Sequence, residues 1–203
     1  MPILTSESGV EIDPALADVA VVLPAAVAND SWTQSGGNAA KSMGHLALPI
    51  GGGPAWTAKI AGASKEARLA AAPVIADGKL YVMGTDAAIT AFNASTGARL
   101  WSVSFGNAGD NKASLFGGGV SVEGAFLYAT NGIGDVGALN VADGSVVWTK
   151  RPGAPLRGAP TIALGSVFVM SQDNQLIALK ASDGTVEWTE AAAVQLAGVF
   201  GVA

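Results

Sequence analysis

The side chains that most often carry enzyme chemistry are scarce in this 203-residue sequence. His45 is its single histidine, and it contains no cysteine. A histidine-dependent catalytic triad would therefore have one available base, and a metal site made of several histidines or of cysteines is excluded. His45 lies in a glycine-rich stretch without a catalytic motif around it, which favours a structural or surface role. We predict from these residues that the protein is not an enzyme.

Two glycine clusters and several polar side chains are weaker candidates for ligand binding. Gly51–Gly53 and Gly117–Gly119 are not followed by the Lys-Ser/Thr of a phosphate-binding loop, so we expect sharp turns there instead. Calcium ligands could come from carboxylates and amides in predicted turns, namely Asn93, Asp110, Asn140, Asp143, Asp173 and Asp183. No D-x-D-x-D-G loop accompanies them, and such residues commonly bond their own backbone in turns. We therefore expect no bound metal and no cofactor.

The bulk composition argues against two further classes of function. The net charge is −5 and no stretch is rich in Lys or Arg, so nucleic acid is not an expected partner. No apolar run reaches the roughly 18 residues of a membrane-spanning helix. Residues 15–28 contain Asp18 and Pro24 and follow no early Lys or Arg, so they do not resemble a signal peptide. Either the protein is cytoplasmic, or the sequence continues upstream of Met1.

The strongest pattern is a repeat that ends in tryptophan. Trp56, Trp101, Trp148 and Trp188 are separated by 45, 47 and 40 residues, the period of a four-stranded β-propeller blade. Two glycines inside each complete copy keep spacings of 19, 20 and 19 residues: Gly78 to Gly97, Gly124 to Gly144 and Gly165 to Gly184. The variation in period therefore lies between the copies, where residues 106–114 form a longer polar loop.

Each copy divides into four short strands joined by glycine-containing turns. The first strands are predicted at residues 72–75, 120–122 and 161–163, and the second strands at 80–83, 126–129 and 167–170. The third strands follow at about 89–92, 136–139 and 176–179, and the fourth strands carry the tryptophans. The second strands are apolar on both faces, which is typical of a sheet packed between two neighbours. Asp-Gly and Thr-Gly before the fourth strand supply the positive φ of a tight turn.

The end of each copy also matches a known motif. Ala91-x-Asn93-x-x-Thr96-Gly97-x-x-x-Trp101 resembles the tryptophan-docking motif of pyrroloquinoline-quinone-type propellers, and two further copies follow with Lys180 replacing the usual acidic or amide residue. The motif residues are Ala91, Gly97 and Trp101, then Ala138, Gly144 and Trp148, then Ala178, Gly184 and Trp188. We interpret the alanine as leaving room for the indole of a neighbouring blade, which stacks over the turn and donates its N–H to backbone.

Within that superfamily, the sequence resembles the BamB family of outer-membrane protein assembly factors. The resemblance rests on the element Trp32-x-Gln34-x-Gly36-Gly37-Asn38, on the following residues 43–46, and on blades without enzyme elaborations. It covers about residues 30–203 and, more weakly, residues 2–24. It implies a non-catalytic lipoprotein scaffold in the periplasm, at the inner face of the outer membrane. The lipidated cysteine of that family is not in this sequence, so a lipid anchor would lie upstream.

The resemblance also implies partners and the loops that bind them. The expected partners are BamA-like periplasmic domains and nascent outer-membrane proteins. Pro155-Leu156-Arg157-Gly158 resembles the docking loop of the family, and an arginine beside a leucine on a protruding loop is a plausible binding hot spot. This match falls one blade earlier than the family register, which points instead to Val199 and Phe200. The candidate partner-binding residues are therefore Leu156, Arg157, Val199 and Phe200, with a solvated loop as the alternative for Arg157.

We therefore predict an all-β fold, a β-propeller of four-stranded antiparallel blades, with about three to four blades present of an expected eight. Residues 1–53 would form an N-terminal extension with a candidate closing strand, and residues 54–203 the blades. An incomplete blade is expected at 54–60, blades at about 71–104, 117–151 and 158–190, and the start of another at 197–203. The alternative function is a fragment of a pyrroloquinoline-quinone-dependent dehydrogenase, although the catalytic Asp, calcium ligands and Cys pair of those enzymes are not recognisable.

Overall fold

The fold is almost entirely β-structure. The computed structural model of the chain describes residues 13–16, 18–48, 51–62, 64–65, 67–69, 71–106, 110–111, 114–156 and 158–191. Within these ranges, twelve strands form three four-stranded antiparallel sheets, and the 3-10 turn η1 (Pro14–Leu16) is the one helical element. The predicted fold class, all-β with four-stranded antiparallel blades, is confirmed.

Each sheet consists of four strands that are consecutive in the chain and hydrogen-bonded in chain order. Blade 1 contains β1 (Val74–Ala76), β2 (Lys79–Met83), β3 (Ala88–Asn93) and β4 (Arg99–Ser104). Blade 2 contains β5 (Gly119–Glu123), β6 (Phe126–Thr130), β7 (Val136–Asn140) and β8 (Val146–Lys150). Blade 3 contains β9 (Thr161–Ala163), β10 (Ser166–Met170), β11 (Gln175–Lys180) and β12 (Val186–Ala191).

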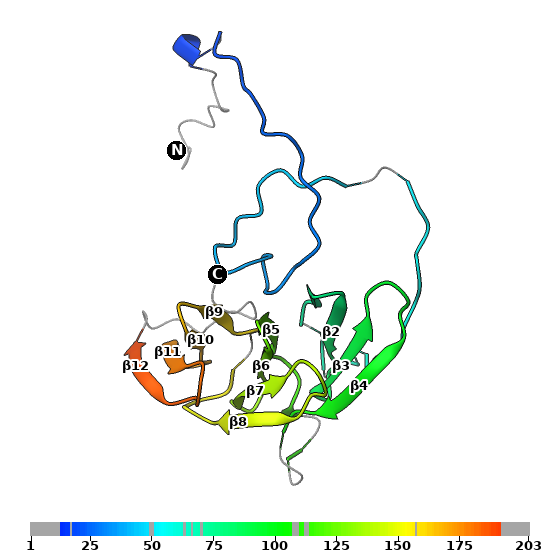
Figure 1. Ribbon diagram of the computed structural model, residues 1–203. Coiled ribbons are helices and arrows are strands. Elements are labelled where there is room, and N and C mark those ends of the chain that lie inside the picture. Colours follow the sequence, from blue (N-terminus) through cyan, green and yellow to red (C-terminus); the bar gives the residue numbers. More distant parts are fainter. Residues whose placement is uncertain are drawn as a thin grey trace, which may run out of the picture.

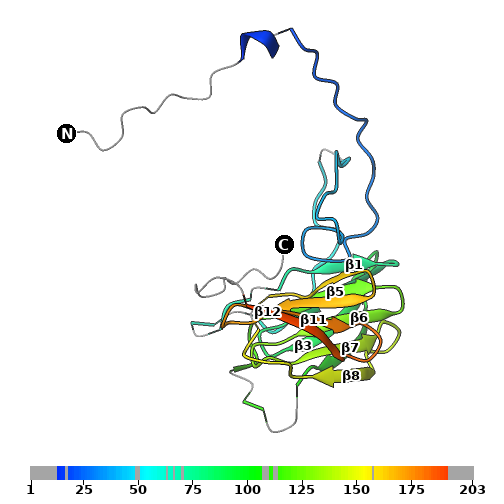
Figure 2. The same ribbon diagram turned by 90° about the vertical axis from the view of Figure 1, so that its left-hand side faces the viewer.

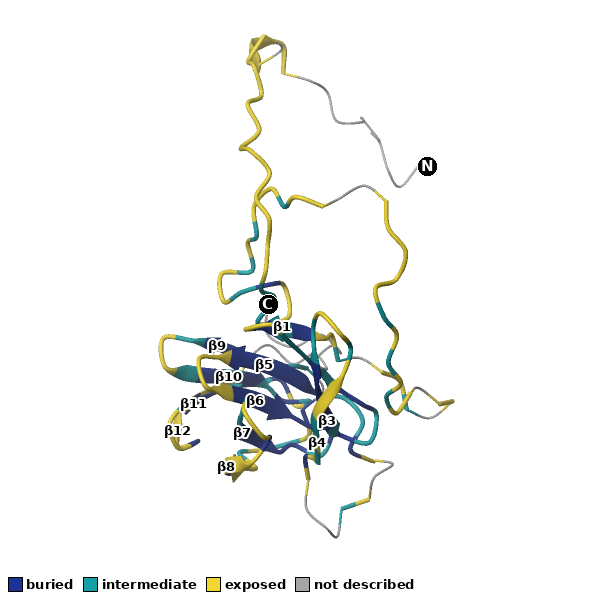
Figure 3. Cartoon of the chain, turned by 45° about the vertical axis from the view of Figure 1, so that its right-hand side comes forward, coloured by how far each residue is buried: buried dark blue, intermediate teal, exposed yellow. Residues whose placement is uncertain are grey.

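The three blades stand side by side in an arc. The fourth strands β4, β8 and β12 lie on its outer side, and the first strands face its inner side (Figure 1). Burial follows this arrangement, since every residue of β12 is exposed whereas four of the five residues of β5 are buried. Figure 3 shows the same contrast between the inner and outer strands. Each blade therefore presents its last strand to solvent and keeps its middle strands between neighbours.

Blade 2 is apolar on both faces because it packs between two blades. Leu127 and Leu139 belong to a core shared with blade 1, which includes the buried ring of Tyr81. Tyr128 and Ala138, which lie one residue away on the same strands, belong to a second core shared with blade 3. Successive side chains of a strand point to opposite faces, so one strand can serve both cores. The predicted packing of a sheet between two neighbours is thus present in the structure.

All three blades share one irregularity of register between their third and fourth strands. The register shifts next to an alanine that pairs with a tryptophan: Ala91 with Trp101, Ala138 with Trp148 and Ala178 with Trp188. A bulge at one point of a ladder bends the strand and increases its local twist. Because the shift recurs at the same position, it gives the three fourth strands the same local geometry.

The chain before the blades is extended and largely exposed. Residues 18–30 run from η1, which lies far from the arc, toward its inner side, and after a turn there the chain passes back beside this stretch (Figures 1 and 2). Val27 and Leu46 form an isolated parallel bridge between these two passes. Within the described ranges, no helix has the length and apolar character needed to cross a membrane. The predicted start of another blade at residues 197–203 lies outside the described residues.

Gly118, just before β5, lies so close to neighbouring backbone that its substitution can be tested. It has a φ of +76°, and a Cβ added there would lie 2.1 Å from the carbonyl oxygen of Thr130. We expect Gly118→Ala to lower the free energy of unfolding by about 1–3 kcal/mol more than Gly124→Ala, because the clash cannot be relieved by side-chain movement. Gly124 is the matched control, since its φ is +58° but nothing lies within 4 Å of its Cβ position. Urea unfolding monitored by circular dichroism would measure both losses, and equal losses would contradict the prediction.

Candidate functional site

Trp101 and Trp148 each link their blade to the next one, and Trp56 links the segment before the blades to blade 1 in the same way. The indole Nε1 of Trp56 donates a hydrogen bond to the carbonyl oxygen of Ala94 at 2.9 Å. Trp101 and Trp148 make the same bond to the carbonyls of Val141 and Ala181, at 3.2 and 3.0 Å. Each acceptor lies in the turn between the third and fourth strands of the following blade. The tryptophans therefore form a ladder, in which the last strand of blade 1 or 2, or the segment before blade 1, is fixed to a turn of the following blade.

The glycines of these turns are the surfaces on which the indoles lie. A Cβ added to Gly97, Gly144 or Gly184 would lie 2.7, 2.8 or 2.5 Å from indole carbons of Trp56, Trp101 and Trp148, respectively. Such distances are well inside van der Waals contact, so a side chain at these positions would displace the indole. Glycine is therefore needed here for the close approach of the ring as well as for the positive φ of the turn.

Short polar side chains hold these turns by local hydrogen bonds. Asn93 Oδ1 accepts from the backbone N–H groups of residues 95 and 96, at 3.0 and 2.9 Å. Asp143 accepts from the backbone and hydroxyl of Ser145, and these bonds hold the pKa of its carboxyl below the usual range. Hydrogen bonds from Thr185 lower the pKa of Asp183 in the same way. These residues, considered above as calcium ligands, bond their own turns.

The motif alanines occupy a different position from the one that the sequence interpretation gave them. Ala91, Ala138 and Ala178 are all buried, and each pairs across the sheet with the tryptophan of its own blade. The indole of the neighbouring blade lies instead against the turn glycine. The small side chain therefore leaves room beside the blade's own indole, and the glycine leaves room for the neighbour's.

An aromatic side chain lies beside the tryptophan in each complete blade. The ring centroids of Tyr81 and Trp101 are 5.9 Å apart, and burial, together with the charge of Asp77, raises the pKa of Tyr81 to about 12. In blade 3, Phe168 and Trp188 form the corresponding pair at 5.9 Å. Trp188 is 41% exposed, compared with 9% for Trp148. The difference follows from the described neighbours, because blade 3 covers Trp148.

The connection from blade 2 to blade 3 follows β8 and contains the predicted partner-binding loop. A buried carboxylate fixes the start of this connection at Arg151. Arg151 Nε donates to Asp135 Oδ1 at 2.8 Å, and Asn131 Nδ2 donates to Asp135 Oδ2 at 2.9 Å. The side chain of Asp135 is 3% exposed, whereas that of Arg151 is 45% exposed. The hydrogen bond to Asp135 raises the pKa of Arg151. Donors from two segments therefore bond both carboxyl oxygens of the buried Asp135 side chain.

The end of the same loop is fixed to blade 3. Leu156 forms an isolated bridge with Ser171, and the backbone N–H of Gln172 donates to the carbonyl of Pro155 at 2.8 Å. The side chain of Leu156 is 1% exposed and packs in the core between blades 2 and 3. The prediction that Leu156 offers an accessible apolar contact is therefore corrected, because its burial makes it an anchor of the loop. Arg157, Val199 and Phe200 lie outside the described residues.

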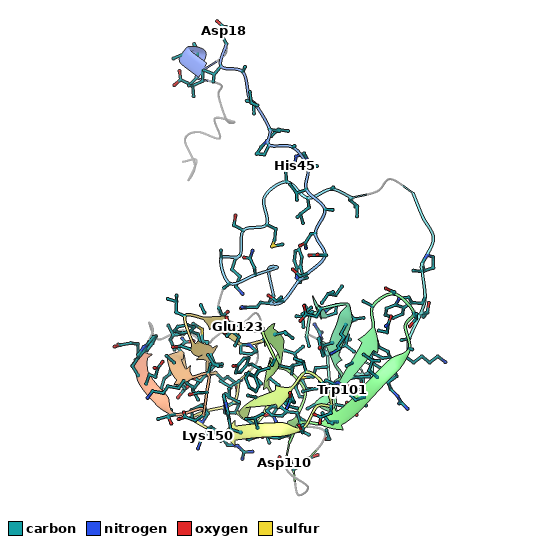
Figure 4. The ribbon with its side chains drawn as sticks, in the orientation of Figure 1. Asp18, His45, Trp101, Asp110, Glu123 and Lys150 are labelled. Carbon is teal, nitrogen blue, oxygen red and sulfur yellow. The ribbon has the colours of Figure 1, made fainter. Side chains whose placement is uncertain are left out.

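The remaining candidates for chemistry lie apart from one another. His45 is on the extended N-terminal segment, away from the blades, and its Nδ1 is 2.8 Å from the carbonyl oxygen of Pro24 (Figure 4). Asp110 lies on the opposite side of the molecule, 3.9 Å from Arg151 (Figure 4). Asp173 bonds Ser171 and Gln175 in its own turn. Among the described residues, no group of three or more His, Cys, Asp or Glu side chains is placed to hold a metal ion.

Two contacts were not anticipated from the sequence. The pair of Asp135 and Arg151 joins residues 16 positions apart on different loops, and neither residue has a local motif around it. Gln34 entered the sequence interpretation only as part of a family signature, yet its side chain is 3% exposed. The sequence signal for Gln34 was its position between Trp32 and the Gly36-Gly37 pair. A polar side chain that is buried beside a tight turn needs a hydrogen-bond partner.

Comparison with known proteins gives a family match over most of the chain. The family model described as outer membrane protein assembly factor BamB matches residues 46–114 and 86–202. The assembly factor BamB of Salmonella typhimurium is 29% identical over 96 residues, which are 46% of this chain and 24% of that protein. Its counterpart in Escherichia coli is 30% identical over 93 residues, which are 44% of this chain and 24% of that protein. The matches thus span about a quarter of the relatives' length.

A solved structure supports the fold. The quinohemoprotein alcohol dehydrogenase of Comamonas testosteroni superposes with a TM-score of 0.63 and 22% sequence identity. The superposition covers 81% of this chain and 28% of the dehydrogenase. At this identity the likeness concerns the propeller architecture.

The tryptophan ladder predicts unequal costs for two chemically identical substitutions. We expect Trp148→Ala to lower the free energy of unfolding by about 3–5 kcal/mol, because it removes a buried ring and leaves a cavity. Trp188→Ala should cost no more than half as much in this chain, because Trp188 is 41% exposed. Chemical denaturation followed by circular dichroism would give both values. Similar losses for the two variants would count against the ladder as the main link between blades.

The buried carboxylate yields a second prediction. We expect Asp135→Asn to destabilise the protein by about 2 kcal/mol, because the amide cannot accept hydrogen bonds at both positions from Arg151 and Asn131. Asp143→Asn is the control, since the amide oxygen can still accept from Ser145 in an exposed turn. Thermal unfolding of the two variants would compare them. A larger loss of stability for Asp143→Asn than for Asp135→Asn would contradict the prediction, because the exposed turn would then contribute more than the buried network.

Proposed function

We propose that this chain, which belongs to the family of outer membrane protein assembly factor BamB, is a non-catalytic scaffold that binds partner proteins through propeller loops. The observation that carries the proposal is the family match over residues 46–202, which includes all three blades. The proposed partners are BamA-like periplasmic domains and nascent outer-membrane proteins. The proposed location is the periplasm at the inner face of the outer membrane, with any lipid anchor upstream of this sequence.

The packing supports a scaffold in physical terms. A binding surface made of loops loses less entropy on association when the loops are already held in place. The loop at residues 151–156 is held at both ends, by Arg151 to Asp135 and by Leu156 to Ser171. Arg157 follows the second of these anchors directly in the sequence. We infer that the charge of Arg157, rather than the side chain of Leu156, is the part of this loop that meets a partner.

The second candidate is a fragment of a pyrroloquinoline-quinone-dependent dehydrogenase. It is favoured by the likeness of fold to the Comamonas alcohol dehydrogenase, with a TM-score of 0.63. The described residues do not fit a calcium ion bound together with such a quinone, because no three carboxylate or histidine side chains come together in them. The scaffold is therefore the better supported proposal.

The proposal is tested by binding of the intact protein to purified BamA-like periplasmic domains. We expect wild type to bind, and Arg157→Ala to weaken the affinity by about tenfold or more, as removal of a hot-spot arginine does. Phe200→Ala is the parallel variant, because the family register places the docking loop near Val199 and Phe200. Circular dichroism of each variant would show that the fold is intact. Surface plasmon resonance would measure the affinities.

The outcomes separate the function from the residues that perform it. Loss of binding only in Phe200→Ala would keep the scaffold and move the docking loop to the next blade. Absence of wild-type binding, together with saturable uptake of pyrroloquinoline quinone and calcium, would replace the scaffold with the dehydrogenase.

A further inference from the structure

A short N-terminal segment contacts the inner strand of each of the three described blades. The backbone N–H of Trp32 donates to the carbonyl of Ile75 in β1 at 2.7 Å, and Ile75 donates back at 2.8 Å. The carbonyl of Thr33 accepts from the backbone N–H of Val122 in β5 at 2.8 Å. The side chain of Gln34 donates to the carbonyl of Ile162 in β9 at 2.8 Å and accepts from its N–H at 2.9 Å. Three successive residues thus bond three successive blades.

The three contacted positions are structurally equivalent. Ile75 pairs with Leu80, Val122 with Leu127 and Ile162 with Val167, each the second pair from the turn between the first two strands of its blade. These first strands lie at the inner edge of their sheets, where one row of backbone groups has no fifth strand to pair with. The segment therefore satisfies the same edge position in each blade.

The need for glutamine follows from the path of the chain. Gln34 begins a tight turn, in which its own N–H and carbonyl bond the carbonyl and N–H of Gly37 at 3.3 and 2.8 Å. Its main chain is therefore occupied and cannot pair with the third blade. A side-chain amide carries donors and an acceptor as a peptide group does, so it can replace the backbone in this pairing. At 3% exposure, Gln34 makes these bonds out of contact with water.

The turn itself is fixed by its glycines and by a lysine. Gly37 has a φ of +102°, and a Cβ added there would lie 2.3 Å from Sδ of Met43. The Nζ of Lys41 donates to the carbonyl of Ser35 at 2.7 Å. The turn is therefore held by contacts within the N-terminal segment itself. Figures 1 and 2 show it on the inner side of the arc.

We propose that residues 32–34 form a clasp that couples blade 1 to blade 3, with Gln34 as the positioning residue for blade 3. Blades in a propeller arc otherwise contact only their neighbours, so each interface fixes one pair. The clasp adds a link that spans three blades, and it does so at one position in each. Its bonds open together, so that loss of the contact to blade 3 loosens the contacts to blades 2 and 1. This inference does not depend on the proposed partner.

The clasp is tested by amide hydrogen exchange, because it protects one N–H in each blade: those of Ile75, Val122 and Ile162. Gln34→Leu keeps the size of the side chain and removes both bonds to Ile162. We expect exchange at Ile162 to become about ten- to a hundredfold faster. We expect exchange at Val122 and Ile75 to become faster too, while the core amides of Leu139 and Val169 stay unchanged. Nuclear magnetic resonance of the folded chain would measure all five rates.

The matched control is Thr33→Val, which keeps the backbone acceptor for Val122 and leaves the three rates near wild type. Faster exchange at Ile162 alone would overturn the clasp, because it would show a local bond without coupling. An equal acceleration at all five amides would overturn it as well, since that pattern reports general destabilisation. If Gln34→Leu does not fold, Gln34→Glu replaces it, because a carboxylate accepts from Ile162 N–H but does not donate to its carbonyl. The same pattern at Val122 and Ile75 is then required.

Discussion

The stacking of one blade's indole on the next blade's turn is the contact on which the arrangement depends. A four-stranded sheet with two apolar faces is stable only when neighbouring blades cover both faces. Each neighbour also has to pack in a fixed orientation. The indole supplies both needs, because its ring buries apolar area while its N–H is directed at one carbonyl. Gly144 and Gly184 leave the space for that ring. Position and orientation are therefore set by the same side chain.

The sequence pattern was sufficient to predict the strands of each blade, but not the contacts between one blade and another segment. Strand positions followed from local signals, since the turn glycines and Trp101, Trp148 and Trp188 recur at nearly constant spacing. Leu156 was misplaced because leucine in a loop between blades is consistent with either exposure or burial, and only the bridge to Ser171 decides between them. Gln34 bonds a residue 128 positions away, and no local pattern can reveal such a pair.

The ladder and the proposed clasp constrain different degrees of freedom. The ladder acts near the outer strands and joins neighbours, so small errors in angle between blades could accumulate along the arc. The clasp acts at the inner edge, where one short turn of chain bonds all three described blades. A contact at each radius fixes a blade against rotation, which neither contact would prevent alone. Ile75, Val122 and Ile162 occupy the same register position in their blades, which allows one short segment to reach all three.

The ladder and the proposed clasp occupy the same end of the blades, and different contacts hold the other end. In an antiparallel sheet, the turn after the first strand and the turn after the third strand necessarily lie at one end. The indoles dock at the second of these turns, and the clasp pairs beside the first. The connections between blades and the turns after the second strands lie at the opposite end. Buried loop residues hold the blades at that end, because Leu156 packs between blades 2 and 3 and Asp135 holds Arg151, so a loop that changes there has to keep these anchors.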